Sequence, residues 1–171
     1  MTQYAFRPAV LGDARSMCEV FVEGFETYRG FAPQGWSPPS TQEEIERLQE
    51  LLGDDDVWYR VAEVDGVVVG FVGFLPAARS YRPVEEPALA HFRQLFVRRA
   101  HWGTGLAARL HAAAIDEAAA RGYAAMRLFT PAGQARARRF YEREGWTLFG
   151  ECKLDEHIGF EMAEYRYALG R

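Results

Sequence analysis

Two glycines separated by one residue form a candidate phosphate-binding turn. They stand in RRAHWGTGLAARL, residues 98–110, between a strand-like run and a helix-like run. Unpaired backbone N–H groups and the positive end of the helix dipole allow the start of a helix to bind phosphate groups. Small side chains would let a ligand touch the backbone. The residues that would form such a turn are Gly103, Thr104, Gly105, Leu106, Ala107 and Ala108.

Two common phosphate-binding motifs do not fit this turn. The nucleotide P-loop needs a Gly-Lys-Ser/Thr sequence, and the stretch holds no lysine. The dinucleotide pattern Gly-x-Gly-x-x-Ala is matched in letters, but residues 98–102 separate the strand from Gly103. The next predicted strand, 124–130, also offers no acid to bind a ribose. A third interpretation is a site for the pyrophosphate of an acyl-CoA, which the turn alone does not establish. A helix start whose residues are small only for packing is its alternative.

A second group of residues, one strand later in the chain, could act on the same ligand. In residues 134–146, Tyr141 follows Phe140 on a predicted helix, with Ala137 one turn earlier and Gly145 after the helix end. A phenol at that place could donate a proton or a hydrogen bond to a leaving group. The alternative is an amphipathic helix in which both aromatic rings belong to the core.

Charge is unevenly distributed along the chain. The net charge is −4, yet residues 98–143 hold nine arginines and only three acids. This segment could bind an anion while the acidic remainder attracts a cation, although solvated helix faces would give the same pattern. A nucleic-acid partner is not expected, because the chain is acidic overall and the arginines lie where CoA phosphates would be held.

The length of 171 residues predicts one domain, residues 1–171. Two β-rich runs flank Asp65-Gly66, a dipeptide typical of tight hairpins. The order of elements is β-α-α-β-β-β-α-β-α-β-β, which predicts a mixed α/β sheet with one β-α-β crossover. Strands are expected over residues 3–10, 57–64, 67–76, 89–97, 124–130, 146–154 and 160–169, and helices over 12–28, 41–52, 104–121 and 133–145.

The two motifs and the element order together resemble the GCN5-related N-acetyltransferase (GNAT) superfamily. The first motif of that family, Gln/Arg-x-x-Gly-x-Gly/Ala, corresponds here to residues 102–107, and the second to Gln134, Ala137, Phe140, Tyr141, Gly145 and Trp146. Trp102 departs from the usual Gln or Arg, and Gln134 from the usual Asn. The resemblance implies a single-domain fold with a mixed central sheet of about seven strands flanked by about four helices, splayed at the acetyl-CoA site.

The resemblance also implies a reaction and a set of site residues. A neutral amine would attack acetyl-CoA directly in a ternary complex, a backbone N–H would polarise the thioester carbonyl, and Tyr141 would be the general acid toward the CoA thiolate. The pantetheine arm would pair with backbone groups of the strand that ends in Leu95, Phe96 and Val97. The implied acetyl-CoA contacts are Leu95, Phe96, Val97, Gly103, Thr104, Gly105, Leu106, Ala107, Ala108, Gln134 and Tyr141.

The general base is the least defined part of this hypothesis. Similar enzymes often place a Glu where this chain has Gln94 or Phe129, and neither of these side chains can take a proton. Four other residues are candidates, either directly or through water, and a structural His is the alternative for the histidines. The candidates are His91 and Glu63, together with Glu86 and His157.

The acceptor is expected to be the primary amine of a small molecule or peptide, and the acidic remainder of the chain would suit a cationic one. The alternative function is a CoA-binding regulatory or scaffold domain without catalysis. Cys18 and Cys152 are far apart and the histidines form no ligand pair, so no metal is expected. Reduced cysteines and no signal peptide or membrane span predict a cytoplasmic protein. The resemblance is compatible with a homodimer.

Overall fold

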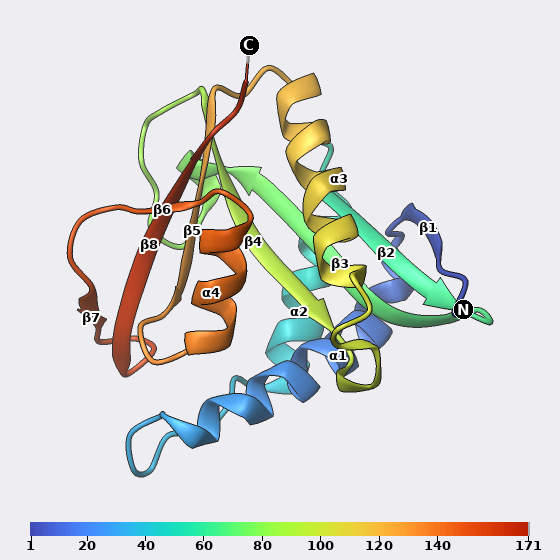
Figure 1. Ribbon diagram of the computed structural model, residues 1–171, viewed down its shortest axis with the longest axis horizontal. Helices are drawn as coiled ribbons and strands as arrows, with labels where there is room; N and C mark the ends of the chain where they lie inside the picture. The colour runs from blue at the N-terminus through green and yellow to red at the C-terminus, as the bar shows by residue number, and fades with distance from the viewer. Residues whose placement is uncertain (171) are drawn as a thin grey trace.

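A mixed sheet forms the centre of the computed structural model, which describes residues 1–170 (Figure 1). The strand order is β1-β2-β3-β4-β5-β8-β6, and β7 also pairs with β8. Neighbouring strands are antiparallel except β4 and β5, which are parallel. The strands are β1 (Ala5–Pro8), β2 (Trp58–Val64), β3 (Val67–Pro76), β4 (Leu89–Val97), β5 (Ala125–Pro131), β6 (Thr147–Leu148), β7 (Lys153–Asp155) and β8 (Phe160–Ala168).

Helices cover both faces of this sheet. In Figure 1, α3 and α4 lie in front of the strands, and α1 and α2 lie behind them. Two hydrophobic clusters correspond to these two layers, one holding Leu110 and Trp146 and the other holding Met17 and Leu48. The α-helices are α1 (Ala14–Phe25), α2 (Thr41–Leu52), α3 (Leu106–Ala120) and α4 (Ala135–Arg143), with 3-10 turns η1 (Leu11–Asp13), η2 (Glu26–Gly30), η3 (Ala77–Arg79) and η4 (Arg99–His101).

The predicted fold class is confirmed, and several element bounds are corrected. The expected strand 146–154 is two short strands, β6 and β7, because Gly150 adopts φ 72° and interrupts the extended backbone. The expected helix 104–121 begins only at Leu106, and the expected helix 12–28 gives way after Phe25 to the 3-10 turn η2. The hairpin at Asp65-Gly66 joins β2 and β3 as predicted.

The sheet opens between β4 and β5. Leu89, Ala90 and His91 pair with residues 125–127, and no pairing of the two strands is found beyond His91 in the described chain. The two strands diverge from that point, with α3 and α4 on either side of the opening (Figure 1). The splay that the resemblance implied is therefore present, and β4 presents an unpaired edge from Phe92 to Val97.

A β-bulge in β4 changes which way its side chains point. Gln94 pairs with Gly73 and Phe92 pairs with Phe74 on β3, so Arg93 is an extra residue in the ladder. Alternation along a strand would send Arg93 and Gln94 to opposite faces, whereas the bulge turns both toward the α2 layer. Two polar side chains thus stand together beside the opening in the sheet.

Candidate functional site

A cavity of about 680 Å³ occupies the opening between β4 and β5. On one side it is lined by Trp102, Ala107 and Tyr141, which belong to the layer of α3 and α4. On the other side it is lined by residues of α1, η2 and the start of α2. The cavity therefore crosses the sheet, and a ligand in it can meet groups from both layers.

The glycine turn has the geometry of an anion site. Gly103 and Gly105 have φ of 75° and 83°, a left-handed conformation that glycine adopts without strain. Thr104 Oγ1 donates to the carbonyl of His101 at 2.7 Å, and no side chain caps the helix at Gly105. The amides of Ala107 and Ala108 form no hydrogen bond with any residue between 1 and 170. These donors at the positive end of α3 are free to bind an anion.

Trp102 precedes the glycine turn, and two arginine side chains lie over its indole ring. Its indole Nε1 donates to the carbonyl of Val97 at 2.8 Å. The Arg136 guanidinium lies 3.4 Å from the centre of the indole ring, and that of Arg99 lies 5.3 Å from it. Neither arginine forms an ion pair within the described residues, and partial burial, then the nearby Arg99, lower the pKa of Arg136. Such a pair of unneutralised cations favours a bound anion.

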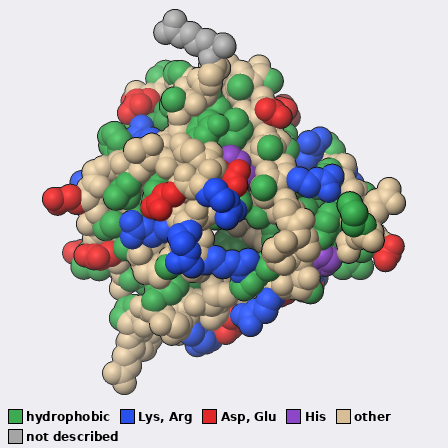
Figure 2. All heavy atoms as spheres, viewed as in Figure 1, with side chains coloured by type: hydrophobic (Ala, Val, Ile, Leu, Met, Phe, Trp, Pro, Cys, Tyr) green, Lys and Arg blue, Asp and Glu red, His purple; other side chains and the backbone are tan. Residues whose placement is uncertain are grey.

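Basic side chains gather around the opening on this face of the molecule. Figure 2 shows Lys and Arg side chains beside a hollow in the region between α3 and α4. The sequence had indicated an arginine-rich segment, but not that Arg136 would be the member in contact with Trp102. Helical spacing alone does not place a residue of α4 beside a loop more than thirty residues earlier.

The pairing register of β4 shows that only two of the three predicted pantetheine contacts have backbone groups on the open edge. The amide of Arg98 donates to the carbonyl of Val69, and Phe96 is paired with Phe71, so the backbone groups of Phe96 point toward β3. Those of Leu95 and Val97 therefore point toward the opening. Phe96 contributes its side chain to the cavity instead of its backbone. Its expected backbone role is corrected accordingly, and the Val97 carbonyl already accepts one bond from Trp102.

Tyr141 is buried and lines the cavity. Its ring packs edge-on against Phe92 and Trp146, and its hydroxyl forms no hydrogen bond with any residue that the structure describes. Burial, with a smaller effect from Tyr28, raises the pKa of the Tyr141 phenol. The hydroxyl thus stays protonated over the physiological pH range and is available as a donor to a ligand.

Gln134 also lines the cavity, but its side chain is already hydrogen-bonded. Its side-chain Nε2 donates to Thr27 Oγ1 in η2 at 3.0 Å, which ties the start of α4 to the opposite layer. Thr27 in turn donates to the carbonyl of Gly24 at 2.7 Å. The amide oxygen of Gln134 is the part of this side chain that is left for a ligand.

The four candidate bases lie in different places. Glu63 is outside the cavity and pairs with Arg7 at 2.5 Å, while the exposed Glu86 also lies outside the cavity, 3.9 Å from Arg166. His157 lines the cavity and is exposed to solvent. Only His91 is both buried and part of the cavity wall. The structure therefore brings the two histidines, but neither glutamate, to the site.

The environment of His91 makes it a weak base. It is only 3% exposed, and its Nδ1 has no hydrogen-bond partner within residues 1–170. Burial, followed by the charges of Arg127 and Arg93, lowers the pKa of His91 to about 3. An imidazole with so low a pKa is poorly matched to accept a proton from an alkylammonium near neutral pH.

A carboxylate that sequence reasoning missed lies in the same cavity. Glu44, in the first turn of α2, accepts hydrogen bonds from Gln94 Nε2 at 2.7 Å and from Arg93 Nη1 at 3.4 Å. Tyr59 donates to Gln94 Oε1 at 2.9 Å and accepts from Arg93 at 2.9 Å, which completes the cluster. In the sequence Glu44 resembles any acid that complements a helix dipole, so no local signal could have distinguished it.

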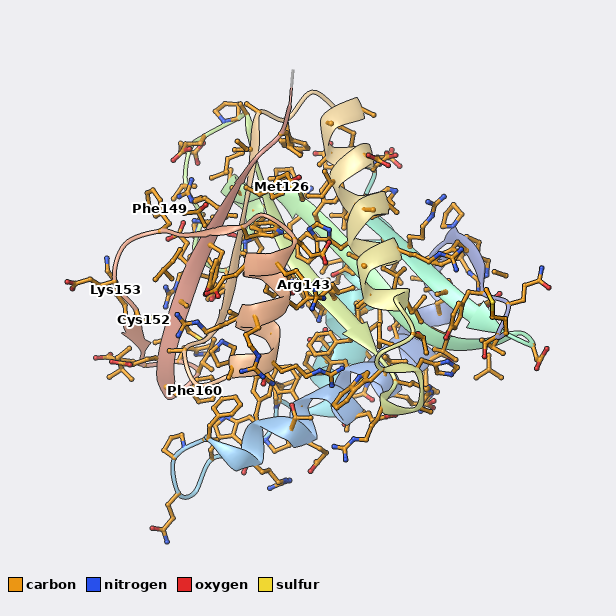
Figure 3. The ribbon with its side chains drawn as sticks, in the orientation of Figure 1. Met126, Arg143, Phe149, Cys152, Lys153 and Phe160 are labelled. Atoms are coloured by element: carbon orange, nitrogen blue, oxygen red, sulfur yellow. The ribbon has the colours of Figure 1, made fainter. Side chains whose placement is uncertain are left out.

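Aromatic rings form the wall of the cavity on the α1 side. The ring of Phe25 lies 4.3 Å from that of Tyr28 and 5.9 Å from that of Phe96. Phe160, labelled in Figure 3, lies at the start of β8. Its ring closes this wall and lies 6.1 Å from those of Tyr28 and Trp36. An apolar group would therefore be accommodated here, next to the polar cluster of Glu44.

Neither a metal site nor a membrane-spanning helix is found among residues 1–170. No group of three or more His, Cys, Asp or Glu residues between 1 and 170 is arranged to hold a metal ion. No helix in that range is long and apolar enough to cross a membrane. Cys18 and Cys152 are both free thiols.

The chain matches the profile of one protein family and is similar to several solved structures. The profile of the acetyltransferase (GNAT) family matches residues 21–146, which is more than half of the chain. No curated protein sequence matches this chain. A Desulfovibrio desulfuricans structure described as a member of the GNAT family has a TM-score of 0.78 at 21% identity, with 98% of this chain and 100% of that chain covered.

Two further structures that are similar to this chain contain a ligand. The paia N-acetyltransferase of Thermoplasma acidophilum, in complex with coenzyme A, has a TM-score of 0.74 at 17% identity and covers 96% of this chain and 99% of its own. The Salmonella typhimurium protein yncA, with its cofactor acetyl-CoA, has a TM-score of 0.70 at 20% identity and covers 98% and 94%. At these identities the likeness shows a shared fold.

The buried His91 predicts a pH dependence of stability. Its folded pKa of about 3 lies below the unfolded value of 6.5, so the unfolded state binds the extra proton between these values and stability falls as the pH falls through that window. From pH 7 to pH 5 His91 should account for a loss of about 2 kcal/mol. Chemical denaturation of a His91→Gln variant should show a correspondingly smaller loss over that interval. The same change at the exposed His157 should leave the loss unaltered; equal losses in wild type and His91→Gln would contradict the assignment.

Proposed function

This chain belongs to the acetyltransferase (GNAT) family, and we propose that it is an N-acetyltransferase acting on the primary amine of a small molecule or peptide. As a member of that family it is an acyltransferase with acetyl-CoA as co-substrate. The observation that carries the proposal is the cavity across the sheet, which joins Ala107 at the start of α3 and Tyr141 on one side to polar and aromatic groups on the other. Two substrates entering from opposite layers can meet at the opening between β4 and β5.

The proposed acetyl-CoA site begins at the start of α3. The free amides of Ala107 and Ala108 and the positive helix end would bind the pyrophosphate. Arg136 would supply the side-chain charge that the family draws from the position held here by Trp102, and stacking on the indole would orient its guanidinium. The pantetheine arm would then follow the edge of β4 and pair with the backbone of Leu95 and Val97.

The proposed chemistry follows from the groups at the opening. A backbone N–H on the free edge of β4, at Leu95 or Val97, would polarise the thioester carbonyl and stabilise the oxyanion. The acceptor nitrogen would attack that carbon directly, without an acyl-enzyme intermediate. Tyr141, held protonated by burial, would donate a hydrogen bond or its proton to the departing sulfur.

A CoA-binding scaffold without catalysis is the second candidate. Two observations favour it: Gln94 stands where similar enzymes often have a Glu, and Trp102 occupies one acceptor site of the Val97 carbonyl. Both candidates predict CoA binding, so affinity for CoA does not separate them. Turnover does.

The proposed function predicts continuous release of CoA thiol from acetyl-CoA when a suitable amine is present. A panel of arylalkylamines, polyamines and short peptides would be assayed with a thiol reagent, and each acetylated product confirmed by mass. We expect at least one amine to give saturable turnover well above hydrolysis. CoA binding together with no turnover for any amine in the panel would favour the scaffold.

Replacing Tyr141 with Phe removes only the hydroxyl from the cavity. We expect kcat to fall at least about tenfold, because the leaving thiolate loses its donor, while the Kd for CoA changes less than about twofold. Steady-state kinetics and calorimetry would measure the two quantities. Tyr123→Phe is the matched control, since Tyr123 packs on Phe74 away from the cavity. Unchanged turnover in Tyr141→Phe would show that the acid role is wrong.

A further inference from the structure

We propose that Glu44 binds the acceptor ammonium and takes its proton, and that the acceptor is a primary amine on an aromatic stem. This inference rests on the proposed N-acetyltransferase function and assigns its missing base. Glu43 and Glu44 are the only carboxylates among the cavity-lining residues of the described chain. Glu43 is exposed, whereas Glu44 is buried and held in place by other side chains.

Three side chains from two strands, Arg93 and Gln94 on β4 and Tyr59 on β2, fix the position of this carboxylate. Arg93 Nη1 donates both to Tyr59 and to Glu44 Oε1, Tyr59 donates to Gln94 Oε1, and Gln94 Nε2 donates to Glu44 Oε1. The bonds close a ring of four side chains. Both bonds to the carboxylate go to Oε1, so Oε2 has no side-chain partner among the described residues and is not one of their fully buried unsatisfied atoms. Oε2 is therefore the oxygen available to an ammonium group.

The backbone of the sheet makes this arrangement possible. The bulge at Arg93 turns both Arg93 and Gln94 toward α2. Tyr59 crosses directly over Gly73, where an added Cβ would lie 2.1 Å from the ring atom Cε1, so only glycine allows the ring to reach Gln94. The Glu44 cluster is thus built into β2 and β3 as well as β4, and it does not depend on a mobile surface side chain.

The aromatic wall next to Glu44 indicates the stem of the acceptor. Phe96, two residues beyond Gln94 on β4, packs against Phe25 in a tilted arrangement, and the rings of Tyr28 and Trp36 continue the wall. The negative faces of such rings attract a cation, and burial against them stabilises a bound aromatic stem. A primary amine one or two carbons from an aromatic ring fits both features.

The step balances without any further reagent. The Glu44 carboxylate accepts one proton from the bound ammonium, directly or through one water, and later releases it to solvent. The neutral nitrogen forms a bond to the acetyl carbon and gives the oxyanion, whose collapse breaks the carbon–sulfur bond and sends its electron pair to sulfur. The second proton lost by the nitrogen ends on the CoA thiol, and Tyr141 donates to that sulfur during its departure.

Charged groups near Glu44 affect the pH dependence of any rate or affinity that involves its carboxylate. They come from each element packed against the carboxylate and from its own helix. The titratable and charged groups that face this region are Arg93 on β4, Tyr59 on β2, Cys18 on α1, and Glu43 and Arg47 on α2. A Glu44→Gln variant retains all of them, so a change in its pH profile reports on the carboxylate itself.

Binding without turnover provides the first test. Calorimetry with 2-phenylethylamine as the probe and CoA-loaded protein would measure ammonium affinity whether or not the protein is an enzyme. We expect Glu44→Gln to weaken binding at least tenfold and the neighbouring Glu43→Gln to change it less than twofold. Equal affinity in wild type and Glu44→Gln would overturn the inference, and thermal denaturation of each variant confirms that the fold is retained.

The pH profile of acetylation provides the second test. At pH 7 Glu44→Gln should lower kcat/KM for 2-phenylethylamine about 100-fold, as expected for loss of a general base. Its residual rate should rise about tenfold per pH unit, because only free amine from solution then reacts, so that the deficit narrows toward pH 9.5. A deficit that stays constant at every pH would overturn the base role and leave Glu44 a merely structural residue.

A conservative variant separates charge from shape. Glu44→Asp keeps the carboxylate but withdraws it by one methylene, so we expect amine affinity within fivefold of wild type and a larger fall in kcat. An Asp variant as impaired as the Gln variant in both quantities would overturn the inference. Should wild type bind the probe yet release no thiol with it or with any other amine of the panel, the proposed function fails while the ammonium site stands, so the two failures are distinguishable.

Discussion

The separation of β4 from β5 is the constraint on which the rest of the structure depends. Only three residues of each strand pair, and within residues 1–170 no strand pairs with β4 on that side beyond His91, where the Trp102 indole bonds to the Val97 carbonyl. Unpaired backbone groups in the middle of a sheet are costly unless something else bonds to them. A ligand with amide groups can complete the sheet there, and the cavity and the start of α3 lie at this place.

The bulge at Arg93 gives the two faces of β4 different chemistry. On the side of α3 and α4, Phe92, Leu95 and Val97 are apolar and face Tyr141 and Trp102. On the side of α2, Arg93 and Gln94 stand together and hold Glu44. Tyr141, the proposed donor for the leaving group, and Glu44, the proposed base for the incoming amine, therefore belong to opposite layers, which suits the direct transfer that we propose.

Local signals in the sequence predicted the elements that depend on local physics. Asp65-Gly66 marked its hairpin, and Gly103 and Gly105 marked the turn before α3, because these conformations are set by a few residues. The strand expected over 146–154 was wrong because the turn at Gly150 interrupts it. Glu44 and Arg136 could not be found in this way, since their roles arise from contacts with Gln94 and Trp102, far away in the chain. Glu63 was suggested by its type alone and lies outside the cavity.

Amide hydrogen exchange, resolved by residue in free and CoA-bound protein, tests the central claim most directly. If the pantetheine arm completes the open edge of β4, exchange at Leu95 or Val97 should slow on addition of CoA, and so should exchange at Ala107 and Ala108. Phe96, whose amide already points toward β3, should change little. Bound CoA with no protection at Leu95, Val97 or the start of α3 would contradict the account, because the ligand would then occupy another part of the molecule.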